Sequence, residues 1–488
     1  MATPTAIKDV STPRDDYLAQ SALWEKCRAV CGSEEEVLSH DLLVHAQGNF
    51  LIPFSPSMTQ EQYNLFKREA ELPGISAEFT QLLVGGLLRK EPQLELPKDA
   101  PEEALDWLTN EFGVDGTPLN AFMQSTVHEE VVTTRGWIFV DYDEDEKIPF
   151  ATMYPAESIV NWRRSKTELT QVIVKVEELL ESSNEFHPVY QPAYYVHELV
   201  NDVYQVRTFK QQYDENGNVR DNNWLQVGDP VIPEMRGKPL NFIPAWPSNG
   251  EIELQNPFLL TIVNKEINLF NKISRRNHLL LGAGTYTPYV SGVADEADFL
   301  KITRSGLGSW LHLPDKDAKI DVVKVPTEAL VDYDRSIEGN IEEMARLGVR
   351  MLSPETAQSG VALQLRNASQ TARLGTLNTK LSAVMTQVIA VMLNWRYGKE
   401  YDASEIKFKM QDDFDNIVTG EGWLRLATEW YENNLIPRSV WINLLKRNDI
   451  IPDDYDDKEG SKEMDKDMLD FKKYSDTMQT KVNDNAIA

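Results

Sequence analysis

Two long segments with helical spacing of apolar residues flank a short, strand-rich insert, and this order restricts the fold more than any other feature of the sequence. Pro257 starts the first segment, 257–283, where apolar residues recur every three or four positions at Leu259, Val263, Ile267, Phe270 and Ile273. A second helical segment, 327–350, follows the insert 284–326. We expect the two helices to lie antiparallel, with the insert at their tip.

The residues before this pair show a mixture of helical and strand-like patterns. Helical periodicity appears over 14–47, 59–72, 76–90, 101–112 and 117–133. Strand-like runs follow over 136–142, 172–177, 194–199 and 203–209, and the segment 214–217 is typical of a turn before a further strand near Trp224. This half of the chain is therefore predicted to be α+β, with an antiparallel sheet.

The residues after the pair are predicted to be mainly helical. A non-helical stretch, 351–365, precedes a long helix over 366–400, and shorter helices are expected over 420–433 and 437–447. With 488 residues the chain is too long for one compact core, so we expect about two to four structural units. The predicted fold class is accordingly α+β and helix-rich.

The charge balance limits what the chain can bind. Forty-nine basic residues stand against 77 acidic ones, a net charge of −28, and the sequence has no dense Lys/Arg cluster. A protein that grips duplex DNA by its phosphates is expected to carry a basic face, so ordinary duplex binding is disfavoured. An acidic wall past which DNA slides is compatible with this charge.

Signals for membranes, secretion or metal binding are not visible in the sequence. No apolar run approaches the roughly 20 residues of a membrane helix, and the N-terminus lacks a signal-peptide pattern. We therefore expect a soluble protein without membrane association, kept in a reducing cytoplasm. Cys27 and Cys31 are too few for a usual metal site and too close on a helix for an unstrained disulfide, so we interpret them as packing residues.

Local catalytic motifs are also missing. The glycine-rich segment 282–285 lacks the Lys-Ser/Thr of a phosphate loop, no Gly-x-Ser-x-Gly elbow occurs, and the seven histidines are scattered. The acidic run 141–146 lacks the glycine of an EF-hand and is interpreted, like Asp412, Asp413 and Asp415, as solvated charge. We predict no catalytic residue, cofactor or metal. Carboxylates that the fold brings together leave a metal-dependent nuclease or transferase as an alternative.

The second helix of the pair carries an acidic stripe. Asp334, Glu338 and Glu342 are each four residues apart, so they line one side of a helix, where like charges repel. The neighbouring stripe is apolar, with Ile337, Ile341, Met344 and Ala345. The pattern fits an ordinary amphipathic helix with its acidic side in water. It also fits the wall of a channel, where repeated subunits would form acidic belts of low friction for a polyanion.

Several segments in a fixed order resemble the portal proteins of tailed phages and prophages. They are 79–97 (FTQLLVGGLLRKEPQLELP), 153–162 (MYPAESIVNW), 243–246 with 256–260 (IPAW, NPFLL), and 348–352 with 355–357 (GVRML, ETA). None of these motifs is chemically unique, and the specificity lies in their order together with the helix–insert–helix layout. The likeness covers roughly residues 75–400.

The resemblance implies a portal fold with a defined order of parts. These are an α/β wing over 1–256, a first stem helix over 257–283, a small α/β clip over 284–326 and a second stem helix over 327–350. A tunnel loop over 351–365, a long wing helix over 366–400, and a helical crown with a charged tail over 401–488 would follow.

The resemblance also implies a structural role without enzymatic activity. Such a protein is a homo-oligomeric ring, usually of about twelve copies, at one capsid vertex of the virion, and it is present in the host cytoplasm during assembly. Its expected partners are double-stranded DNA without sequence specificity, the terminase large subunit, adaptor, head-completion or tail proteins, and major capsid and scaffolding proteins. Another structural virion or scaffold-binding protein, such as a capsid-associated connector without a channel, stays open as an alternative.

The same likeness gives candidate site residues. The predicted channel-lining residues are Asp334, Glu338, Glu342, Ser353, Glu355, Thr356, Gln358 and Ser359. The predicted clip residues for partner docking are Tyr289, Trp310 and His312. Because the β unit around Trp310 is too small to be stable alone, we expect the clip to exchange strands with its neighbours or to pack edge to edge with them.

Overall fold

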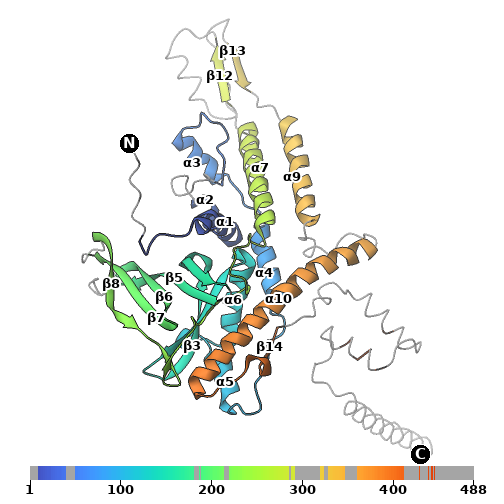
Figure 1. Cartoon of the computed structure of the whole chain (residues 1–488). Coiled ribbons are helices and arrows are strands. Elements are labelled where there is room, and N and C mark those ends of the chain that lie inside the picture. The colour runs from blue at the N-terminus through green and yellow to red at the C-terminus, as the bar shows by residue number, and fades with distance from the viewer. Residues whose placement is uncertain are drawn as a thin grey trace, which may run out of the picture. The chain divides into compact units, whose positions relative to one another are not determined.

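A computed structural model describes most of the chain. The described residues are 9–39, 50–166, 168–180, 186, 188–213, 219–284, 287–291, 319–323, 328–346 and 360–410, with 428, 438, 441, 442 and 445. The chain forms two compact units, of which the first comprises Met1–Ala357 with Thr376–Gln411, and the second comprises Gln358–Gly375 with Asp412–Ala488. The mixed helix-and-sheet content agrees with the predicted class (Figure 1).

Six helices occupy the N-terminal part of the first unit. They are α1 (Asp15–Gly32), α2 (Glu34–Ser39), α3 (Gln60–Arg68), α4 (Ile75–Leu87), α5 (Glu103–Asn110) and α6 (Leu119–Thr133). The single helix predicted over 14–47 is interrupted at Ser33, which is extended and whose hydroxyl accepts a hydrogen bond from the Glu36 N–H, so that a new helix begins. Residues 40–47 of that prediction lie outside the described residues.

Side chains of α1, α4 and α6 form the helical core. Trp24, Cys27, Leu87, Met123 and Val127 are at most 1% exposed. Cys27 and Cys31 are both free thiols, and burial raises their pKa values to about 12 and about 11. Cys27 is buried and Cys31 half-buried, which agrees with their interpretation as packing residues.

An antiparallel sheet of five strands follows; an antiparallel sheet was predicted, but the predicted strand 136–142 belongs to a separate sheet. Its strands pair in chain order: β4 (Ile159–Ser165), β5 (Glu168–Leu179), β6 (Tyr190–Val200), β7 (Val203–Tyr213) and β8 (Val219–Val231). One face carries a buried cluster of Val160, Ile173, Tyr194 and Val196, against which Phe209 and Trp224 pack. The turn predicted over 214–217 lies outside the described residues.

Several shorter sheets complete this unit. β2 (Gly136–Asp143) pairs with β3 (Ile148–Pro155) and β11 (Ala245–Pro247), β1 (Gln93–Glu95) pairs with β14 (Lys407–Lys409), and β9 (Glu234–Met235) pairs with β10 (Lys238–Pro239). The sequence analysis assigned no strand to β3 or β4. The prolines at both ends of β3 weaken its propensity, and its strand form is fixed by its long pairing with β2.

Three long helices dominate the remainder. They are α7 (Leu260–Gly284), α9 (Glu328–Arg346) and α10 (Gly360–Tyr397). Between α7 and α9 the chain forms the hairpin β12 (Thr287–Ser291) and β13 (Lys319–Val323), which matches the predicted strand-rich insert in part. The predicted loop 351–365 is wrong at its end, because α10 already begins at Gly360 and no breaking residue follows it in the sequence Val-Ala-Leu-Gln-Leu.

The C-terminal half of α10 is a core helix. Its segment Gly375–Tyr397 is long and apolar enough to cross a membrane by length and composition, with a mean hydropathy of 1.2. Half of this apolar stretch is buried within the protein, and Leu381, Met385, Val388 and Ile389 have no exposed surface. The helices predicted over 420–433 and 437–447, and Asp412, Asp413 and Asp415, fall almost entirely outside the described residues.

Candidate functional site

Near its first turns, the helix α7 is attached to the N-terminus of α4. Glu266 has no exposed surface, and its carboxylate accepts hydrogen bonds from the Ile75 N–H at 2.7 Å and the Ser76 N–H at 2.6 Å. It therefore caps the N-terminus of α4 from another helix. Burial raises the pKa of the Glu266 carboxyl, while these hydrogen bonds oppose that rise. The capping contact fixes where α7 leaves the body.

The second half of α7 is held by the segment 50–72. The Asn271 side chain donates to the Phe50 carbonyl and accepts from the Ile52 N–H, each at 2.7 Å. Further along, His278 Nδ1 lies 2.6 Å from a Glu69 carboxylate oxygen. The His278 ring also packs against Phe54, with the ring centroids 4.9 Å apart. These contacts leave little freedom for this side of α7.

The opposite side of α7 meets α9, and the two helices lie side by side in Figure 1. Lys265 Nζ is 2.6 Å from a Glu343 carboxylate oxygen, Lys272 Nζ donates to Asn340 at 3.1 Å, and Arg276 forms an ion pair with Asp334. Residue numbers rise along α7 as they fall along α9. The helices are therefore antiparallel, as the sequence predicted.

The two helices carry opposite charge. In the sequence of α7 four cations, Lys265, Lys272, Arg275 and Arg276, stand against one acid, Glu266, which gives +3. In the sequence of α9 six acids, Glu328, Asp332, Asp334, Glu338, Glu342 and Glu343, stand against two arginines, Arg335 and Arg346, which gives −4. The contact is thus electrostatically complementary along its length. The acidic stripe of α9 was predicted from the sequence, whereas its basic counterpart on α7 was not.

The structure divides the predicted acidic stripe. Asp334 faces α7 through its ion pair with Arg276, whereas Glu338 and Glu342 are exposed. In the neighbouring apolar stripe Met344 is buried, but Ile341 remains 46% exposed. The stripe is therefore not a uniform face turned away from the protein.

The other predicted site residues are only partly placed. Tyr289 lies on β12 opposite Asp321 of β13 in the strand register. Two groups fall outside the described residues, namely the clip residues Trp310 and His312, and the loop residues Ser353, Glu355, Thr356, Gln358 and Ser359.

A buried arginine lies where the chain approaches α7. Arg135 is 2% exposed, and its guanidinium lies 4.9 Å from the Trp137 ring centre and 5.1 Å from that of Trp162. Its Nη1 donates to the carbonyls of Glu251 and Ile252 at 2.8 and 3.1 Å. Burial lowers the pKa of Arg135 to about 10, so it stays charged at neutral pH. The residue ties the segment before α7 to the start of β2.

Two buried glutamates on α6 hold neighbouring segments. The Glu129 carboxylate accepts from the Ala156 N–H at 2.9 Å and pairs with Arg28 at 2.5 Å. Glu130 accepts a hydrogen bond from the Ser248 hydroxyl, and burial raises its pKa to about 7. The sequence analysis missed both residues. The sequence did contain a sign of their burial. Glu129 and Glu130 are the only acidic residues of a largely apolar helix, and acids in such a helix are buried only when they are paired.

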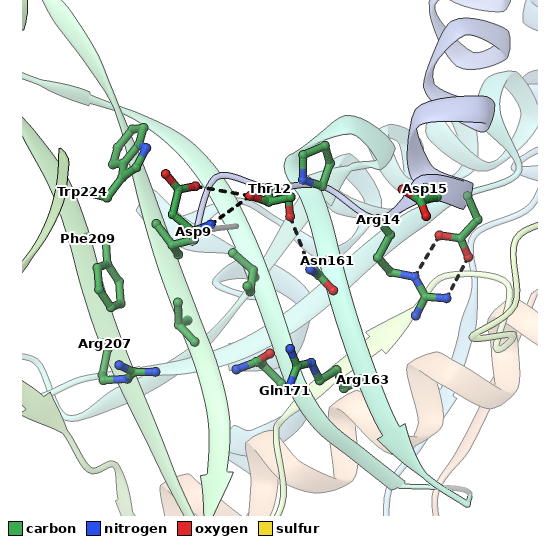
Figure 2. A pocket seen from close by; sticks show the side chains of 15 residues that line it. Asp9, Thr12, Arg14, Asp15, Asn161, Arg163, Gln171, Arg207, Phe209 and Trp224 are labelled. Carbon is green, nitrogen blue, oxygen red and sulfur yellow. Dashed lines mark hydrogen bonds and ion pairs between the residues drawn. The ribbon is translucent and has the colours of Figure 1, made fainter. Parts of the chain in front are cut away.

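Figure 2 shows a groove beside the five-stranded sheet. It lies between the N-terminal residues and the five-stranded sheet, and has a volume of about 850 Å³. Three acids, Asp9, Asp15 and Asp16, balance three arginines, Arg14, Arg163 and Arg207, among its lining residues. Arg14 is paired with Asp16, and Arg207 with Glu198. The groove therefore offers no strongly charged surface for an ionic ligand.

The alternative of a metal-dependent carboxylate enzyme would require several ligand side chains close together. Within the described residues, no group of three or more His, Cys, Asp or Glu side chains is arranged to hold a metal ion. In the acidic run 141–146, the Asp143 carboxylate accepts hydrogen bonds from the N–H groups of Asp145 and Glu146, at 2.8 and 3.0 Å. Those acids occupy the turn between β2 and β3, where Asp143, Glu144, Asp145 and Glu146 are exposed, as predicted for solvated charge.

The sequence of this chain matches one protein-family model over part of its length. The model of a domain of unknown function, DUF4055, matches residues 258–396, from the approach to α7 to the end of α10. No curated protein matches the sequence.

Solved structures similar to the chain include a gene transfer agent particle and a phage portal protein. The neck of an empty gene transfer agent particle has 10% identity and a TM-score of 0.39, with 80% of this chain and 94% of that chain covered. An HK97-family phage portal protein from Corynebacterium diphtheriae has 11% identity and a TM-score of 0.33, with 74% and 98% covered.

Proposed function

We propose that this chain is the portal protein of a tailed phage or prophage. It would form a ring at one capsid vertex, through which double-stranded DNA is packaged and later ejected, and it would have no enzymatic activity of its own. The observation that carries the proposal is the antiparallel pair α7–α9 with β12 and β13 between its helices, followed by α10. This is the order of stem, clip, stem and long wing helix that the sequence resemblance implies.

Exposed apolar side chains on the pair support assembly into a ring. Leu280 and Leu281 on α7 are 49% and 51% exposed, and Val331 and Ile341 on α9 are 56% and 46% exposed. Burial of such side chains against a neighbouring subunit is favourable, at about 25 cal/mol per Å² of apolar surface. A head-to-tail contact that closes on itself would cover them in every subunit.

The remaining assignments follow from the proposed ring. Glu338 and Glu342, with the loop residues Ser353, Glu355, Thr356, Gln358 and Ser359, would line the channel and contact DNA without reading its sequence. The clip, with Tyr289, Trp310 and His312, would dock the terminase large subunit and then adaptor, head-completion or tail proteins. The wing and crown would contact the capsid and scaffolding proteins during assembly.

Electron microscopy of the purified chain, with its mass measured in parallel, tests the proposal. We expect rings with a central hole wide enough for duplex DNA, roughly 20 Å across. A matched pair of variants locates the contact: Leu281→Asp on the exposed side of α7 should prevent rings, whereas Val219→Asp on the sheet should not. Rings without a hole would favour a connector without a channel. A compact monomer that cleaves DNA with added Mg²⁺ would refute the proposal.

A further inference from the structure

Each cation of α7 is engaged within the protein. Lys265 pairs with Glu343, Arg276 pairs with Asp334, and Lys272 donates to Asn340. Arg275 is directed instead to the Pro53 carbonyl, at 3.4 Å from its Nη2. The basic character that the sequence gives to α7 is therefore taken up by its neighbours, chiefly by carboxylates of α9.

Without those carboxylates, the cations of α7 would be available to bind the phosphates of a polyanion such as DNA. Lys265 and Arg276 are eleven positions apart, which at 1.5 Å per residue is about 16 Å along the helix. Their side chains are each 32% exposed even when paired, so solvent already reaches them. Cations at such positions bind phosphates in proportion to their number, and they make release dependent on salt. A channel subunit with free cations here would hold DNA instead of letting it pass.

Stability alone does not explain these two ion pairs. Glu343 and Asp334 are 50% and 48% exposed. Exposed ion pairs contribute little to folding, because water and salt screen them and ordering two long side chains costs entropy. Their consequence for surface potential is larger, since each pair replaces a cation by a neutral contact.

We propose that Asp334 and Glu343 mask Arg276 and Lys265 from duplex DNA. This inference rests on the proposed function, because it assigns a purpose to α9 in a subunit past which DNA moves. It also separates two roles within the acidic residues of α9. Asp334 and Glu343 neutralise cations of the same chain, whereas Glu338 is left exposed as a negative charge that repels the duplex.

The effect on DNA binding can be estimated from counterion release. Each phosphate contact adds about 0.9 to the slope of log affinity against log salt. Two unmasked cations per chain should thus steepen the slope by about 2. Between roughly 50 and 200 mM salt, the affinity gained by unmasking should fall about tenfold.

The experiment compares variants that change the net charge equally. Fluorescence anisotropy with a labelled duplex of random sequence measures binding by the full chain over a salt series. Asp334→Asn with Glu343→Gln removes the two masking charges. The control, Glu95→Gln with Glu253→Gln, removes two acids that pair with Lys407 and Arg164 away from α7. A third variant adds Lys265→Gln and Arg276→Gln to the unmasked chain.

We expect the unmasked variant to bind DNA more tightly than the wild type, and the added cation substitutions to abolish the gain. Acetylation of Lys265, followed by mass spectrometry, reports unmasking independently of DNA and should be faster in Glu343→Gln. An equal gain in the control variant would show that the effect does not depend on the cations of α7 and would overturn the proposal. So would unchanged DNA affinity together with unchanged Lys265 reactivity.

The same protein samples, imaged for rings, distinguish this inference from the proposed function. Tighter DNA binding by the unmasked variant, in the absence of rings in the wild type, would refute ring formation by the chain alone but retain the electrostatic pairing. Rings in the wild type with no change on unmasking would refute only the masking role.

Discussion

Replacing Glu130 by Gln should change how the stability of the protein depends on pH. The carboxyl is 2% exposed, accepts a hydrogen bond from Ser248 and lies beside the like charge of Glu129. Burial is the largest cause that raises its pKa from 4.5 to about 7, while Ser248, Arg135 and Lys380 act in the opposite direction. In the folded protein the proton is thus held more tightly than in the unfolded chain.

The sign follows from proton linkage. Above pH 4.5 the unfolded chain loses the Glu130 proton while the folded protein retains it, so stability falls as pH rises and the cost is complete above about pH 7. Since one pKa unit corresponds to about 1.4 kcal/mol, the full cost is about 3 kcal/mol. Most of this cost develops between pH 5 and pH 8. Glutamine cannot ionise, so this component disappears in the variant.

Urea unfolding followed by tryptophan fluorescence, at pH 5 and pH 8, measures the effect. The quantity to compare is the change in unfolding free energy between the two pH values, because any constant cost of burying an amide then cancels. Glu144→Gln, in the exposed turn between β2 and β3, is the matched control and should behave like the wild type. The same pH dependence in Glu130→Gln as in the wild type would refute the reasoning.

Two further predictions concern the anchor of α7 and the clip. Glu266→Ala should lower the unfolding free energy by about 2–4 kcal/mol, because two buried backbone N–H groups at the start of α4 lose their acceptor, and Glu266→Gln should recover part of it. A loss below about 0.5 kcal/mol, measured by urea unfolding, would contradict the capping role. Trp310→Ala should prevent ring assembly as seen by electron microscopy, and intact rings would show that the clip does not hold neighbouring subunits together.

Much of the secondary structure was predictable because its causes are local. Apolar spacing indicated the N-terminal helices, α7, α9 and most of α10, and alternation indicated β5, β6 and β7. Thr59 and Gln62 form a capping box that begins α3 next to the predicted position. β3 and β4 were missed, because prolines and charges obscure their alternation and their pairing with neighbouring strands decides their form.

The candidate site was predictable only in outline. The sequence by itself determined that two helices flank a β insert and that the second is acidic, since composition and periodicity are properties of each segment alone. Only the tertiary structure decided that Asp334 meets Arg276, 58 positions away, and that Arg135 holds the carbonyl of Glu251, 116 positions away. Periodicity reports which side of a helix is apolar, but the partner of a charge is chosen by packing between distant segments. For the same reason the burial that sets the pKa of Glu130 is a property of the folded protein.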